Sequence, residues 1–210
     1  MEHVPEPVFG EFLTELDMYS AQLGYVLDKL AQIEQQIRDE YERIEDNYNP
    51  EYHDAGDVWY QAAKNVLGVD TMFAPHFQKS GAIGGYCIIV YHLFERFLEE
   101  LCRIKQISFA DEFHLPKFFE SFSVLKSHPS FASIQELKDV VNFCKHGRGI
   151  AETVLRKRRP DYFKFNPDPP WEHETLKPLS GYDLEIQPED FKAYVSEMRK
   201  MTAEIQGLLG

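Results

Sequence analysis

The sequence predicts an all-α protein, an up-and-down bundle of four to five main helices. Apolar residues recur at steps of three and four over long stretches, which is the spacing of one helix face. The strand-like content is too small for a sheet. Hydrophobic residues make up 43% of the chain, so a sizeable core can be buried. We expect a single domain over residues 1–210.

The first predicted helix is long and covers residues 8–48. Its apolar side chains advance in alternating steps of four and three, so they stay on one face. These side chains are Phe12, Leu16, Tyr19, Leu23, Val26, Leu30, Ile33 and Ile37. A helix of this length either pairs with an equally long helix or projects beyond the bundle. An acidic, turn-like stretch and a shorter amphipathic segment, Val58 to Leu67, follow it.

The second long helix is predicted over about residues 75–105. Its centre is apolar nearly all round, which is typical of the innermost helix of a bundle. Gly81, Gly84 and Gly85 would let a neighbouring helix approach closely, although a helix break near Gly84 is the competing interpretation. Residues 107–131 are expected to be irregular or to form short helices.

A third helix is predicted to begin at Ser133, with Glu136 as its capping-box partner, and to end at Gly147 or Gly149. The most proline-rich stretch, residues 156–182, is expected to be an irregular loop. The last helix is predicted over residues 188–209, because Pro188 suits a first helical turn.

The predicted third helix carries an ionisable strip on the side away from its apolar face. Asp139, Asn142 and His146 are spaced three and four apart, which places them on one face. Lys138 and Lys145 flank this strip, and Lys138 is expected to lie on a different face. This strip is the candidate for chemistry.

Basic residues gather beside this strip. Residues 138–164 hold eight basic and three acidic side chains, in a protein whose net charge is −13. A protein this acidic does not bind nucleic acid through its overall charge, so any RNA contact needs a local basic patch. The alternative is a solvated basic loop that pairs with the acidic surface of the protein itself. The predicted RNA-binding residues are Lys145, Arg148, Arg156, Lys157, Arg158 and Arg159.

Two segments resemble the HEPN superfamily of α-helical domains. Tyr91–Leu98 is similar to an apolar helix of the family that carries a Glu, and Glu95 stands at that position here. Glu136–Gly147 is similar to the helix that ends in R-N-x-x-x-H. Together they define a HEPN-like core over residues 75–150.

The resemblance implies a helical bundle, usually dimeric, and active members are metal-independent ribonucleases that serve as toxins or antiviral effectors. His146 would then match the catalytic histidine, which activates the ribose 2′-OH or protonates the leaving oxygen. Asn142 would match the polar residue after the family's Arg, and Asp139 completes the predicted catalytic set. Where the family has its Arg, this chain has Val141, Val140 and Asp139.

Other sequence features indicate what the protein lacks. Three cysteines with no zinc-ligand spacing are expected to be buried free thiols in a reducing compartment. His92, Glu95 and Glu99 share a helix face and could bind a metal, but a core histidine with a nearby carboxylate is the favoured interpretation. No leader or membrane span is recognisable, so we expect a cytoplasmic protein. We also expect no cofactor and no metal.

Three functional hypotheses follow from these observations. The first is a divergent HEPN-like protein that targets RNA in a defence or toxin setting, as a metal-independent endoribonuclease, with an antitoxin or effector protein as partner. The second is a non-catalytic module that forms a homodimer or binds a partner through its long helices. The third is a ligand-binding bundle that uses the Gly84–Gly85 crossing.

Overall fold

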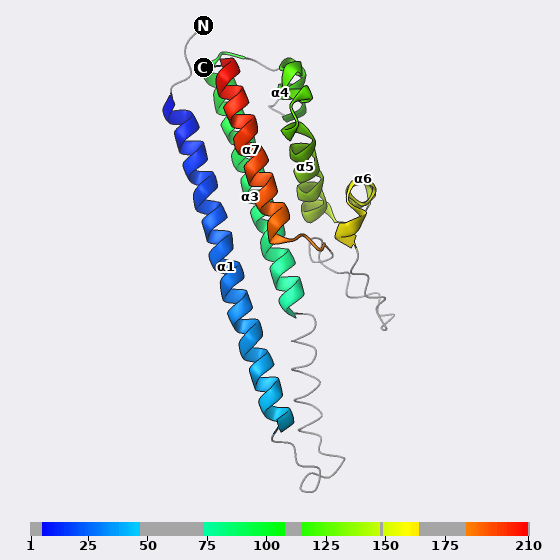
Figure 1. Ribbon diagram of the computed structural model, residues 1–210. Helices are drawn as coiled ribbons and strands as arrows, with labels where there is room; N and C mark the ends of the chain where they lie inside the picture. Colours follow the sequence, from blue (N-terminus) through cyan, green and yellow to red (C-terminus); the bar gives the residue numbers. More distant parts are fainter. Residues whose placement is uncertain (1–5, 47–73, 108–114, 148, 164–183, 210) are drawn as a thin grey trace.

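The computed structural model describes residues 6–46, 74–107, 115–147, 149–163 and 184–209. All regular elements in these ranges are helices (Figure 1), which confirms the predicted all-α class. In chain order they are α1 (Glu6–Asp46), α3 (Ala74–Ile104), α4 (Leu115–Ser121), the 3₁₀ helix η1 (Ser123–Ser127), α5 (Ser130–His146), α6 (Ile150–Arg158), the 3₁₀ helix η2 (Pro160–Phe163) and α7 (Pro188–Leu209). The predicted segment Val58 to Leu67 lies outside the described residues.

Helix α3 is the centre of the bundle, as its apolar sequence predicts. It contacts α1, α5 and α7, and it runs without a break through Gly84. Its inward side chains are fully buried, among them Cys87, Val90, Phe94 and Leu98. The surrounding helices are therefore positioned by the faces that they present to α3.

Helix α1 packs antiparallel along α3 (Figure 1). The rings of Phe12 and Phe97 stack with their centroids 4.4 Å apart. Two ion pairs join the same helices, Glu15 to Arg96 and Glu34 to Lys79, each at 2.6 Å.

The apolar stripe of α1 is core only over the first half of the helix. Phe9, Phe12, Leu16 and Leu23 are buried, whereas Ile33 is 48% exposed. The alternating steps of four and three therefore predicted the helix correctly but overstated how much of its stripe the bundle covers.

Helix α5 crosses α3 at Gly84. A Cβ atom at this position would lie 3.0 Å from Sγ of Cys144, whereas a Cβ at Gly85 would meet nothing within 4 Å. The predicted close helix approach is therefore found at Gly84.

Helix α5 begins at Ser130, so the prediction of a start at Ser133 is wrong. Pro129 has helical backbone angles, φ −53° and ψ −36°, and the ring Nδ1 of His128 accepts a hydrogen bond from the Ser130 backbone N–H at 3.2 Å. The helical conformation of Pro129 and the hydrogen bond from Ser130 to His128 start the helix three residues before Ser133. Glu136 is not in a capping box, because its carboxylate binds Tyr194 and Arg159 instead.

Two glycines reverse the chain between α5 and α6. Gly147 has φ 69° and Gly149 has φ 119°, both in the region that favours glycine. The reversal lays α6 against α5, with Leu155 buried. The prediction of a loop over residues 156–182 is therefore wrong for residues 156–158, which end α6, and for η2, while residues 164–182 lie outside the described residues. The predicted last helix is confirmed as α7.

The crossing at Gly84 can be tested with a matched pair of glycines. Alanine stabilises a helix by about 1 kcal/mol relative to glycine where its methyl group meets no neighbour, so Gly85→Ala should raise the free energy of unfolding by up to this amount. Gly84→Ala should instead lower it by about 1 kcal/mol, because its methyl group crowds Cys144. Urea unfolding followed by circular dichroism measures both values. The loss should shrink in a Cys144→Ala background, and equal effects at the two glycines would contradict the crossing.

Candidate functional site

A pocket lies where α3, α4 and α5 meet. Its volume is about 320 Å³, and α5 contributes Lys138, Asn142 and Lys145 at spacings of four and three residues. The lining residues are Tyr91, His92, Glu95, Leu115, Pro116, Lys138, Val141, Asn142 and Lys145. Two lysines, an amide, a histidine and a carboxylate thus surround an apolar edge supplied by α4.

His92 is held between a carboxylate and an ammonium group. Its Nδ1 lies 2.8 Å from Oε2 of Glu95, and its Nε2 lies 3.0 Å from Nζ of Lys145. Because an ammonium group only donates, Nε2 accepts from Lys145 and the Nδ1–H donates to Glu95. The structure thus defines the tautomer and the ring orientation of His92. The side chain is 46% exposed, so the predicted core position is wrong although the predicted carboxylate partner is present.

Tyr91 forms a neutral wall of this pocket. Its side chain is 4% exposed. Burial, and then the nearby Glu95 and Asp139 carboxylates, raise the pKa of Tyr91 well above the ordinary range. The phenol therefore stays protonated and adds no charge to the pocket.

The predicted catalytic residues Asp139, Asn142 and His146 lie along one side of α5, but of the three only Asn142 lines the pocket. Successive residues of an α-helix are about 100° apart, so Lys138 and Lys145 lie roughly 40° and 60° to one side of Asn142. By the same rotation, His146 and Asp139 lie roughly 40° and 60° to the other side. Asn142 lines the pocket together with Lys138 and Lys145, so Lys138 lies on a different side of α5 from His146, as expected. His146 is exposed at the end of α5.

Asp139 is directed to α6 rather than into the pocket. Its Oδ2 lies 2.9 Å from Nη1 of Arg158, an ion pair without the geometry of a hydrogen bond. Burial raises the pKa of Asp139 above its ordinary 3.8, and Arg158 and Lys138 offset part of that shift. Asp139 therefore anchors α6 to α5 at an electrostatic cost.

Arg159 is the centre of a polar cluster that joins α5, η2 and α7. Its guanidinium group binds Glu136 at 2.6 Å, Asp161 at 2.7 Å and Asp190 at 3.1 Å, and it lies 3.8 Å from the centroid of the Tyr162 ring. Although burial opposes its charge, the hydrogen bonds to these carboxylates hold the pKa of Arg159 above its ordinary range.

Two tyrosine hydroxyls complete the Arg159 cluster. The hydroxyl oxygens of Tyr162 and Tyr194 lie 2.8 Å apart, and the Tyr194 hydroxyl donates a hydrogen bond to Glu136 at 2.6 Å. Sequence reasoning missed this cluster, because Glu136 and Asp190 lie 23 and 31 residues from Arg159.

The other predicted RNA-binding residues lie in different surroundings. Arg156 and Arg158 are engaged within the protein, Arg156 with Glu152 at 2.9 Å and over the Phe163 ring at 4.0 Å. Lys157 is exposed on α6, whereas Lys145 lines the pocket. Arg148 lies outside the described residues. Much of the basic stretch therefore pairs with the protein's own acidic side chains.

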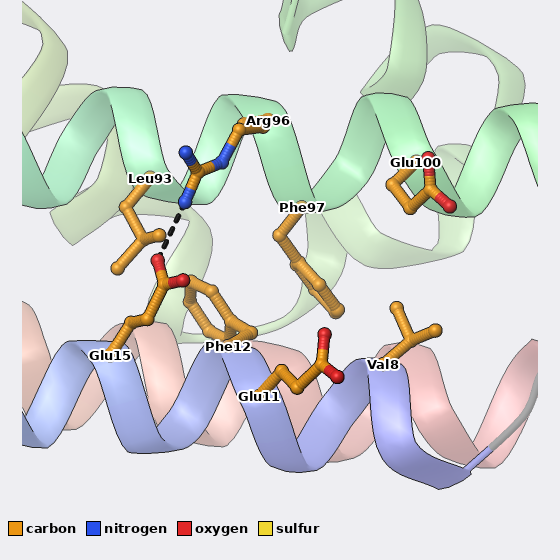
Figure 2. A pocket seen from close by; sticks show the side chains of 8 residues that line it. All are labelled: Val8, Glu11, Phe12, Glu15, Leu93, Arg96, Phe97 and Glu100. Atoms are coloured by element: carbon orange, nitrogen blue, oxygen red, sulfur yellow. Dashed lines mark hydrogen bonds and ion pairs between the residues drawn. The ribbon is translucent and has the colours of Figure 1, made fainter.

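A second pocket, of about 330 Å³, lies between α1 and α3 (Figure 2). Its apolar lining is Val8, Phe12, Leu93 and Phe97, and Figure 2 shows Glu11 projecting from α1 and Glu100 from α3. The one arginine of its lining, Arg96, is paired with Glu15 at 2.6 Å. Its excess of carboxylates disfavours a phosphate ligand.

The cysteines offer no reactive thiolate. Cys87, Cys102 and Cys144 are free, and Cys87 and Cys102 are buried. Burial raises the pKa of Cys102 to about 11 and that of Cys144 to about 12. Both thiols are therefore protonated at neutral pH, a state that is a poor nucleophile and a poor metal ligand.

Among the described residues, no three or more His, Cys, Asp and Glu side chains gather in a way that could hold a metal ion. Within the same ranges, no helix combines the length and the apolar character needed to cross a membrane. Comparisons with protein-family models, curated proteins and solved structures find no match to this chain.

The electrostatic cost of Asp139 predicts a pH-dependent stability. Its folded pKa is raised, so the folded protein holds the proton more tightly than the unfolded chain does. Ionisation therefore costs stability above the folded pKa, and this cost vanishes as the pH falls toward the ordinary 3.8. Asp139→Asn should raise the free energy of unfolding at pH 7, and the difference from wild type should close toward pH 4. Urea unfolding between pH 4 and 8 measures it.

Asp28→Asn, on the exposed surface of α1, is the matched control and should show no such trend. A destabilised Asp139→Asn variant at pH 7 would mean that the ion pair with Arg158 outweighs the burial of Asp139.

Proposed function

We propose that this chain is a divergent HEPN-like protein that acts on RNA as a metal-independent endoribonuclease, with the α3–α5 pocket as its phosphate-binding site. The observation that carries the proposal is the set of Lys138, Asn142 and Lys145, which line one pocket from one face of the helix that resembles the family motif. A defence or toxin setting, with an antitoxin or effector protein as partner, is part of this proposal.

The chemistry of the pocket supports a phosphate ligand. Two ammonium groups and one carboxylate, that of Glu95, line the pocket, and the Asp139 carboxylate beside it interacts electrostatically with Lys138 and Tyr91. A phosphodiester anion would therefore meet an excess of positive charge, in a protein that is otherwise acidic. The Asn142 amide can donate to a phosphate oxygen, and the lysines can take over the charge compensation that the family assigns to its Arg.

The phosphate site predicts a specific loss of RNA affinity. Lys145→Gln should weaken binding of a 5′-fluorescent single-stranded RNA by roughly 10- to 150-fold, because one charge-assisted hydrogen bond contributes about 1.5–3 kcal/mol. Each lost phosphate contact should also reduce the salt slope of log K by about 0.7. Fluorescence anisotropy in EDTA at several salt concentrations measures both effects.

Lys126→Gln, at an exposed position on η1, removes the same charge away from the pocket and is the control. If the two substitutions weaken binding equally, RNA binds through overall charge and not at the pocket. If Lys145→Gln binds RNA like the wild type, the pocket is not the RNA-binding site. If the wild type neither binds nor cleaves the RNA, the proposed function is wrong.

The second candidate function is a homodimerisation or partner-binding module, and a specific observation favours it. Met18, Tyr25 and Ile33 are 44%, 65% and 48% exposed, and their spacings of seven and eight residues place them along one side of α1. Exposed apolar side chains in a row are a feature of helix-pairing surfaces.

Association through α1 can be tested at these exposed positions. Tyr25→Asp with Ile33→Asp should convert a wild-type dimer into a folded monomer, because the carboxylates would be buried without partners at the interface. Light scattering after size-exclusion chromatography measures the mass. Ala193→Asp with Ala203→Asp, at exposed positions of α7, is the control for added charge. Leu23 is unsuitable, since it is 2% exposed and belongs to the core. A monomeric wild type would contradict the homodimer.

A further inference from the structure

We infer that His92, oriented by Glu95, is the acid–base catalytic residue of the α3–α5 pocket, and that His146 is not. This inference rests on the proposed RNA-directed function and assigns the chemistry to a residue on a different helix from the one that the family resemblance indicates. The assignment follows from where the two imidazole rings lie relative to the lysines.

The hydrogen bonds of His92 prepare it to accept a proton. Glu95 Oε2 takes the Nδ1–H at 2.8 Å, which leaves the lone pair of Nε2 directed toward Lys145. A carboxylate that orients a histidine in this way is a recurring device of acid–base sites. The groups that face His92 are Glu95 and Tyr91 from α3, Lys138, Asn142 and Lys145 from α5, and the apolar Leu115 and Pro116 from α4.

His146 lacks these features. It lies roughly 80° and 100° around α5 from Lys138 and Lys145, and it is not among the residues that line the pocket. Its imidazole is exposed at the last residue of the helix. A phosphate held by Lys138 and Lys145 would therefore present the neighbouring ribose to His92 rather than to His146.

The reaction balances with these residues alone. Nε2 of His92 takes the proton of the ribose 2′-OH as that oxygen attacks phosphorus, so the P–O2′ bond forms and the P–O5′ bond breaks. The Lys145 ammonium group gives a proton to the leaving O5′. The imidazolium of His92 then returns its proton to the Lys145 amine, which lies 3.0 Å away, and both groups are restored. The products are a 2′,3′-cyclic phosphate and a 5′-hydroxyl end.

The two histidines can be separated by single substitutions in the full chain. The probes are a 5′-fluorescent single-stranded RNA of mixed sequence and its DNA counterpart, each incubated with EDTA. His92→Ala should slow cleavage of the RNA by about 100-fold or more at unchanged affinity, as expected for loss of an acid–base group. His146→Ala should cleave like the wild type, and the DNA should stay intact because it lacks the 2′-OH.

Added imidazole should restore cleavage to His92→Ala, a result that a merely structural role would not give. Both histidines are exposed, so circular dichroism should show that both variants remain folded. If the wild type cleaves and His92→Ala cleaves equally well, the assignment of His92 is overturned while the proposed function stands. If loss in His92→Ala comes with weaker RNA binding and no rescue by imidazole, His92 is a binding residue only. If the wild type leaves the RNA intact, the proposed cleavage and this assignment both fall.

Discussion

The close contact between α3 and α5 at Gly84 is the constraint on which the candidate site depends. Because Gly84 has no side chain, Sγ of Cys144 can approach the α3 backbone, and the two helices come together at this point. His92 lies eight residues further along α3, and Lys145 follows Cys144 directly. Two of the three helices that line the pocket, α3 and α5, are therefore held at a separation that depends on Gly84 having no side chain.

The Arg159 cluster explains why the excess of basic residues over residues 138–164 does not produce an equally strong positive surface in the folded protein. Three carboxylates from α5, η2 and α7 surround one guanidinium group, so the local balance of charge there is negative. Arg156 and Arg158 also face acidic side chains at 2.9 Å. The positive charge that remains near the motif comes from Lys138 and Lys145, which line the pocket together with one carboxylate, that of Glu95.

The long helices α1, α3 and α7 could be predicted from the sequence because each depends on local spacing of apolar residues, and Pro188 indicated where α7 begins. The start of α5 and the existence of α6 could not, because His128, Pro129 and the reversal at Gly147 act through backbone geometry. The candidate site was predicted only in part. Asn142 and Lys145 were identified, but His92 was expected in the core and Lys138 was not expected at the site, because the lining of the pocket depends on how α5 is rotated against α3.

The ion pairs between α1 and α3 select one alignment of two long helices. A stripe with steps of four and three repeats itself after seven residues, so a slip by seven would again match apolar side chains with one another. The slip in one direction would place Arg96 opposite Gln22 and Lys79 opposite Tyr41. The slip in the other would place them opposite Val8 and Leu27, so either slip separates both cations from Glu15 and Glu34. Surface charges of modest individual strength thus favour this alignment over the misaligned bundles that the apolar stripe alone would tolerate.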